Sequence, residues 1–114
     1  MKLRFVFAIA AAAVVGLGVT ASAQDKALIE KGSKVYAAAT PKCSTCHSIA
    51  GTGNKKSPLD GVGAKLSEAD IRSWLTDPKG MAAKAKAPTT MPVYAKLSKA
   101  DQDALVAYLF SLKK

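Results

Sequence analysis

Histidine and cysteine are scarce in this chain of 114 residues, which contains one histidine and two cysteines. A structural zinc site takes four ligands. These three side chains would therefore need carboxylates or a second chain to complete one. A disulfide between the two cysteines, which lie three positions apart, would close too small a loop to stabilise the fold much. The sequence thus disfavours both a zinc site and a structural disulfide.

Strand patterns and internal repeats are also lacking. A C-x-x-C pair can belong to a thioredoxin-like redox protein, but that class places the pair among strands that alternate with helices.

Acidic residues are few, 8 against 17 Lys and Arg, which gives a net charge of +9. The lysines are interrupted by Ala and Gly rather than massed in one basic tract, so we expect no nucleic-acid partner.

The one long apolar run lies near the start of the chain. Fifteen mostly apolar residues, Phe5–Val19, follow Lys2 and Arg4 and precede the triplet Ala21-Ser22-Ala23. This order is typical of an export signal that is cleaved after the triplet. The run is shorter than the roughly 20 residues of a membrane-spanning helix. We therefore expect cleavage rather than a retained anchor.

Cleavage after Ala23 assigns residues 1–23 to a signal peptide and residues 24–114 to one small domain. The loss of Lys2 and Arg4 lowers the net charge from +9 to +7. A domain of this size usually needs a covalent link or a cofactor to stabilise it. We expect a periplasmic monomer with no stable membrane insertion after cleavage.

The motif Cys43-Ser44-Thr45-Cys46-His47 is the arrangement that attaches a c-type haem. On one helical turn, positions i, i+3 and i+4 share a face. Cys43 and Cys46 would then reach the two vinyl groups of one porphyrin, with His47 beneath the iron as its proximal ligand. Export agrees with this prediction, because bacteria attach haem to cysteine pairs outside the cytoplasm.

Helical spacing of the apolar residues predicts an all-α domain of about four helices. Ser67 and Ser98 each begin a capping-box pattern, with Asp three positions later. Gly32 would cost about 1 kcal/mol in a helix relative to Ala, so it is either merely tolerated or lets another helix approach closely. The expected helices cover residues 25–39, 68–76 and 99–112, with a turn at the haem motif, a loop over 51–58 and a short exposed helix over 81–87.

These landmarks, in this order, resemble the class I c-type cytochromes, which are small monohaem electron carriers. The resemblance covers essentially all of residues 25–114. It implies the cytochrome c fold, in which helices and loops wrap around one covalently attached haem. The landmarks after the haem motif are Pro58-Leu59-Asp60-Gly61-Val62-Gly63, Trp74-Leu75, Met91-Pro92 and the Leu105/Tyr108/Leu109 pattern of the last helix.

The resemblance implies that Met91 is the second axial ligand. The residues alone leave a thioether, a lysine or an open position, because a single histidine excludes an iron held by two histidines. Met81 is the competing thioether, in Ala/Lys-rich surroundings that suggest an exposed helix. Met91 lies in a segment bracketed by Pro88 and Pro92, which could present its sulfur.

The resemblance also implies supporting roles around the haem. The carbonyl of Pro58 would accept a hydrogen bond from the far ring nitrogen of His47. Trp74 would close one haem edge and could donate its indole N–H to a propionate, or else serve as a plain core aromatic. The first and last helices would cross, with Gly32 and Tyr36 packed on Leu105 and Tyr108.

One-electron transfer between periplasmic redox proteins is the expected function, because two fixed iron ligands leave no room for substrate. We therefore expect an electron carrier and not an enzyme. The alternatives are the electron-accepting subunit of a periplasmic dehydrogenase and an open-site haem enzyme or gas sensor. We expect redox partners with an acidic docking surface, since these lysines should lie near the haem opening: Lys42, Lys55, Lys56, Lys84, Lys86 and Lys96.

Overall fold

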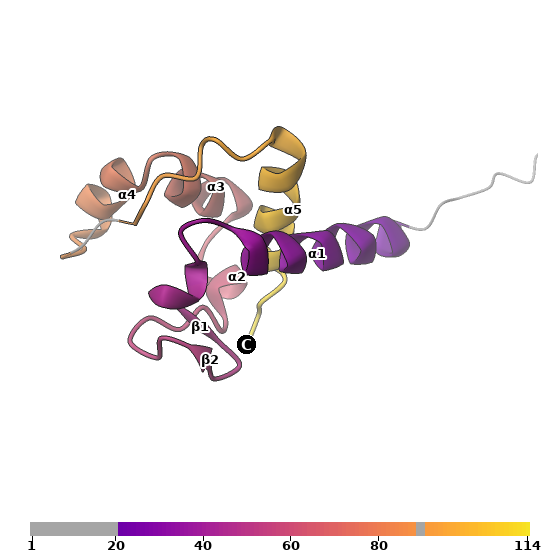
Figure 1. Ribbon diagram of the computed structural model, residues 1–114, viewed down its shortest axis with the longest axis horizontal. Coiled ribbons are helices and arrows are strands. Elements are labelled where there is room, and N and C mark those ends of the chain that lie inside the picture. Colours follow the sequence, from indigo (N-terminus) through magenta and orange to yellow (C-terminus); the bar gives the residue numbers. More distant parts are fainter. Residues whose placement is uncertain (1–20, 89–90) are drawn as a thin grey trace, which may run out of the picture.

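The computed structural model describes residues 21–88 and 91–114, and it is mostly helical (Figure 1). The all-α prediction is confirmed, with one very short hairpin added. The elements in chain order are α1 (Ala21–Ala38), a 3-10 turn (Cys43–Thr45), β1 (Ser48–Ile49), β2 (Thr52–Gly53), α2 (Val62–Lys65), α3 (Glu68–Thr76), α4 (Pro78–Ala85) and α5 (Lys99–Phe110).

Helices α1 and α5 cross and pack against each other (Figure 1). Gly32 lies at the crossing, where an added Cβ would overlap the backbone carbonyl of Ala104. One turn further along α1, the ring of Tyr36 meets that of Tyr108 edge to face, with centroids 5.9 Å apart. The close helix approach predicted at Gly32 is therefore confirmed, because any side chain there would push the helices apart.

Serine caps begin α3 and α5 as the capping patterns predict. The Oγ of Ser67 accepts a hydrogen bond from the backbone N–H of Asp70 at 3.1 Å. The Oγ of Ser98 accepts one from the N–H of Asp101 at 3.2 Å. Each cap satisfies an N–H group that has no partner inside its helix. Both helix starts are thus encoded locally.

The core lies where α3 and α5 meet. Leu105 of α5 is completely buried and belongs to one apolar cluster with Ile71 and Leu75 of α3. At the edge of this contact, the Arg72 guanidinium lies 2.5 Å from a carboxylate oxygen of Asp103. The ion pair is partly exposed, so the buried side chains contribute most to the α3–α5 contact.

The loop prediction for residues 51–58 needs correction. Ser48 pairs with Gly53 and Ile49 with Thr52 in an antiparallel hairpin. The strands contain two residues each, which is too short to show the alternation of apolar and polar residues that identifies a strand.

One helix was not predicted, and another begins earlier than predicted. Helix α2 forms at Val62–Lys65, where the sequence shows no sustained helical period. Helix α4 begins at Pro78 instead of residue 81, because proline is favoured in the first turn of a helix. It also buries Pro78 and Ala82, so it is not simply exposed.

None of the helices in the described ranges has both the length and the apolarity needed to span a bilayer. Residues 1–20, most of the predicted signal peptide, lie outside the described residues. The predicted cleavage site after Ala23 falls inside α1. Thr89 and Thr90, in the segment predicted to be extended, are likewise outside the description.

Candidate functional site

The haem motif folds as one tight turn, as its spacing predicts. The backbone N–H groups of Cys46 and His47 both donate to the carbonyl of Cys43, at 3.2 and 3.0 Å. These i+3 and i+4 bonds bring the three residues onto one side of the turn. All three side chains line the same cavity.

A backbone carbonyl holds the imidazole of His47. Its Nδ1 lies 3.0 Å from the carbonyl oxygen of Ser57. Because a carbonyl oxygen only accepts, Nδ1 carries the proton and donates it, which leaves the lone pair of Nε2 free. A hydrogen bond of this kind fixes both the orientation and the tautomer of the ring. His47 is therefore prepared to bind a metal through Nε2.

The predicted acceptor for His47, the carbonyl of Pro58, is wrong by one residue. Ser57 also accepts the N–H of buried Ser48 at 3.3 Å, and the N–H of Leu59 donates to Ser48 at 2.8 Å. These two bonds form a parallel bridge between Ser48 and Pro58. In extended backbone, successive carbonyls point to opposite sides, so the Ser57 carbonyl faces His47. Pro58 itself is exposed and does not line the cavity.

Asn54 is a structural residue of the site that the sequence interpretation missed. Its backbone N–H donates to the carbonyls of Ser44 and His47, both at 3.0 Å. Its side-chain amide donates to the carbonyl of Thr45 at 3.1 Å, and its Oδ1 accepts the N–H of Lys56 at 3.0 Å. Asn54 thereby ties the haem-motif turn to the loop that follows. Its sequence signal is only the turn-forming composition of that loop.

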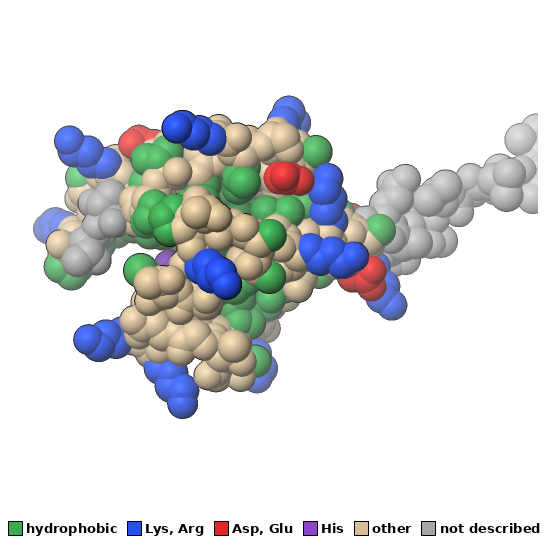
Figure 2. Space-filling view, in the orientation of Figure 1, with side chains coloured by type: hydrophobic (Ala, Val, Ile, Leu, Met, Phe, Trp, Pro, Cys, Tyr) green, Lys and Arg blue, Asp and Glu red, His purple; other side chains and the backbone are tan. Residues whose placement is uncertain are grey.

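The haem motif faces a cavity of about 480 Å³. Figure 2 shows the molecule hollowed between its α3–α4 side and its hairpin side, with histidine surface visible inside. Met91 lines this cavity, whereas Met81 does not. Much of the remaining wall is aliphatic and comes from Leu59, Leu66, Ile71, Leu75, Leu105 and Leu109.

The cavity also contains the predicted aromatic residue, Trp74. It lies in α3, is partly buried, and contributes to the wall. The structure therefore brings Trp74 and Met91 together with the haem motif, although 44 positions separate Met91 from His47 in the sequence.

The polar groups in the wall are mostly uncharged. The pKa of the Cys43 thiol is raised, chiefly by burial. The thiol is therefore protonated at neutral pH. Burial likewise raises the pKa of Tyr36 and of Tyr94 to about 12. The hydroxyl of Tyr94 donates to the carbonyl of Pro41 at 2.6 Å. The hydroxyl of Tyr36 is buried and has no hydrogen-bond partner within the described part of the chain.

These residues fit a haem. Two thiols, an imidazole with a free Nε2 and a thioether meet in one largely apolar cavity. Among the described residues that line the cavity, one is a lysine, Lys56, and none is an aspartate or a glutamate. Across residues 21–88 and 91–114, no group of three or more His, Cys, Asp or Glu side chains could hold a bare metal ion. The donor set therefore suits a metal carried in a macrocycle.

Comparison with known families gives the same result. The family model for cytochrome c matches residues 29–113, which include every residue of the cavity wall. This chain belongs to the cytochrome c family. The predicted class I c-type cytochrome and its fold are thus confirmed, and haem-based electron transfer is the chemistry of the family.

This cytochrome is also similar to a subunit of a larger enzyme. It is 29% identical over 109 residues to the cytochrome c oxidase subunit 2 of Alkalihalophilus pseudofirmus, an alignment that covers 88% of this chain and 30% of that protein. The chain therefore spans less than a third of that relative's length. No match to a solved structure was found.

Proposed function

We propose that this cytochrome carries single electrons between periplasmic redox proteins, through one haem attached covalently at Cys43 and Cys46. The observation that carries the proposal is the cavity, which brings the C-x-x-C-H motif and Met91 together. The bound haem would supply the Fe(II)/Fe(III) couple. The chain would supply the attachment, the two axial ligands and an apolar wall that limits water.

His47 and Met91 are the proposed axial ligands. The bond from Nδ1 of His47 to Ser57 leaves Nε2 as the ligating nitrogen. Met91 is the methionine of the cavity wall, and Met81 lies outside it. A thioether favours the reduced iron and raises the potential.

Two protein ligands would close the iron, which argues for a carrier over an open-site enzyme or gas sensor. Trp74 would cover one haem edge, with its indole N–H directed to a propionate. A potentiometric titration of the haem-loaded protein tests the proposal, and one reversible one-electron wave is expected. Rapid ligand binding by the reduced, unmodified protein would contradict it.

Export completes the proposal. The basic start, the apolar run Phe5–Val19 and the Ala21-Ser22-Ala23 triplet support a signal peptide cleaved after Ala23. The mature protein would then begin at Gln24 in the periplasm. An intact mass that retains residues 1–23, measured on protein from the native host, would contradict the cleavage.

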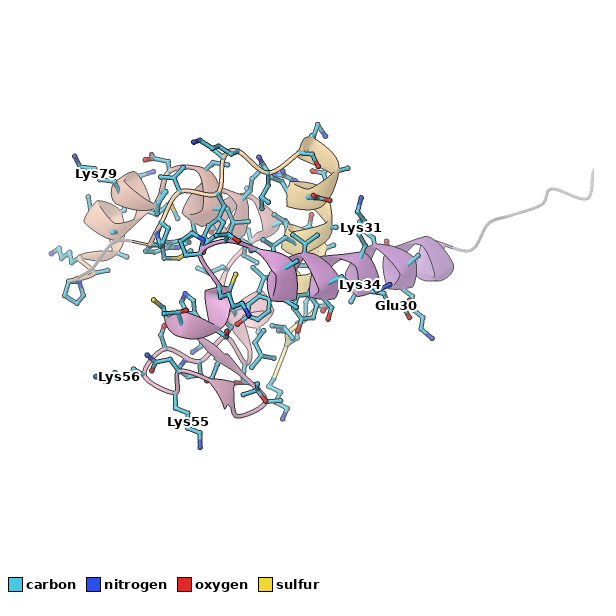
Figure 3. The ribbon with its side chains drawn as sticks, in the orientation of Figure 1. Glu30, Lys31, Lys34, Lys55, Lys56 and Lys79 are labelled. Atoms are coloured by element: carbon cyan, nitrogen blue, oxygen red, sulfur yellow. The ribbon has the colours of Figure 1, made fainter. Side chains whose placement is uncertain are left out.

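Lysines on two sides of the cavity support an acidic partner. Lys56 lines the cavity, and it lies with Lys55 on the hairpin side, whereas Lys79 projects from α4 on the other side (Figure 3). Around an exposed haem edge, such charges would steer and orient an acidic redox protein. Lys79 was not among the lysines expected near the haem opening.

Charge reversal at Lys55 and Lys56 should slow electron transfer to an anionic oxidant. With hexacyanoferrate(III) at low ionic strength, we expect the second-order rate to fall about 10-fold. The difference should shrink near 0.15 M salt, where the Debye length is about 8 Å. Stopped-flow oxidation of the reduced protein measures both effects.

The matched control is Lys34→Glu, an exposed lysine that Figure 3 places on α1, away from the hairpin. Its rate should change less than that of the hairpin variants. Oxidation by neutral benzoquinone should be insensitive to salt in every variant. Equal effects at all three lysines would reject a localised docking surface.

The similarity to an oxidase subunit 2 supports a second candidate role, in which this cytochrome delivers electrons to a terminal oxidase. The site would be the same and only the acceptor would differ. Oxygen consumption by membranes of the native host, on addition of the reduced protein, separates this role from that of a dehydrogenase subunit.

A further inference from the structure

Tyr94 is buried in the core, in contrast to the two residues just before it. Its side chain is only 5% exposed and belongs to the apolar core cluster. Of the residues between it and Met91, Pro92 is exposed and Val93 is 59% exposed. Tyr94 is therefore the first buried residue after Met91. It is the point at which the chain that follows Met91 packs into the core.

Two hydrogen bonds connect Tyr94 to distant parts of the chain. Its hydroxyl donates to the carbonyl of Pro41 at 2.6 Å, across 53 positions. Its backbone N–H donates to the carbonyl of Leu75, near the end of α3, at 2.8 Å. Pro41 lies two residues before Cys43, and Tyr94 lies three residues after Met91. The hydroxyl bond therefore joins the segment with the first haem-motif cysteine to the segment with Met91.

The geometry assigns Tyr94 as the positioning residue that keeps Met91 and Pro92 in the cavity wall, through its hydroxyl bond to Pro41. The assignment rests on the proposed function, in which Met91 is an axial ligand. Loss of the hydroxyl would remove one end of this cross-link while leaving the buried ring in place. Met91 and Pro92 would then leave the cavity wall more often, and an external ligand would reach the haem iron more often.

The chain offers a matched control for loss of a tyrosine hydroxyl. Tyr36 lines the same cavity, and its buried hydroxyl has no hydrogen-bond partner in the described residues. Tyr36→Phe removes the same atom from the same cavity without breaking a hydrogen bond within the described residues. Ser98→Ala is a second control, because it removes the α5 cap and lowers global stability without removing the hydrogen bond from Tyr94 to Pro41.

The test uses the haem-loaded protein and carbon monoxide. In the reduced state, Tyr94→Phe should increase the rate of carbon monoxide binding on the order of 10-fold, as expected from the loss of one partly buried hydrogen bond. In the oxidised state, the long-wavelength absorption of the iron–thioether bond should persist, because the ligand is still present. Tyr36→Phe and Ser98→Ala should bind carbon monoxide within about twofold of the unmodified rate, since neither changes the Tyr94–Pro41 hydrogen bond.

A Tyr94→Phe rate that matches that of Ser98→Ala at equal thermal stability would overturn the assignment, because general destabilisation would then explain the opening. Met91→Ala separates the two proposals. If Met91→Ala opens the iron and Tyr94→Phe does not, only the role of Tyr94 is wrong. If Met91→Ala leaves the iron closed, the axial assignment fails and the role of Tyr94 fails with it.

Discussion

Met91→Ala should free one ligand position of the haem iron for external ligands, and Met81→Ala should leave that position occupied. Met91 lines the cavity that holds His47, whereas Met81 lies outside the lining. The oxidised Met91→Ala protein should lose the weak long-wavelength band of iron–thioether coordination. The reduced protein should bind carbon monoxide, and its potential should fall because the thioether no longer favours the reduced iron.

Met81→Ala is the matched control, because it truncates a side chain of the same type. Truncation of partly buried Met91 also removes packing and costs up to about 2 kcal/mol, so a thermal melt should accompany the spectra. If the band survives in Met91→Ala and vanishes in Met81→Ala, the axial ligand is Met81. Loss of the band in neither variant would indicate that the sixth ligand is not a methionine.

Haem should remain on the polypeptide after denaturation and acid–acetone extraction. Cys43 and Cys46 both line the cavity, on the turn that also carries His47. The denatured protein should exceed the mass of the apoprotein by one haem. In the double variant Cys43→Ser/Cys46→Ser, extraction should remove all of the haem, because no thioether can form.

The single variants refine this result. Either Cys43→Ser or Cys46→Ser alone should retain haem through the remaining thioether, with lower stability in the folded holoprotein. Extraction of haem from the unmodified protein would contradict covalent attachment and leave only the axial ligands to hold the group.

Local patterns predicted the parts of the site that depend on neighbouring residues. The C-x-x-C-H spacing predicts the turn at Cys43–His47, and its i+3 and i+4 hydrogen bonds are present. Ser67 and Ser98 predict the helix starts for the same reason, because a cap forms within four residues. Gly32 left two interpretations open, a tolerated glycine or a close helix approach, and the contact with Ala104 in α5 decides for the second.

Contacts between distant segments were less accessible to sequence analysis. The acceptor for His47 is Ser57 and not Pro58, and a bridge between loop residues decides which carbonyl faces the ring. The bond from Tyr94 to Pro41 spans 53 positions and leaves no periodic pattern. Asn54 shows only turn composition, although it closes the motif turn. Such contacts depend on tertiary packing, which a one-dimensional pattern does not encode.

The contact at Gly32 also bears on the order in which the chain folds. Its partner, Ala104, lies 72 positions later, and α5 is the last described helix to be synthesised. Most of the stability of a helix in a protein comes from the packing of its apolar face, and the largest packing partner of α1 is α5. The interface can form only after the intervening chain has been made, and contacts of such long range slow folding. Cys43 and Cys46 lie between α1 and α5 in the sequence, so both cysteines have been synthesised before the α1–α5 interface can form.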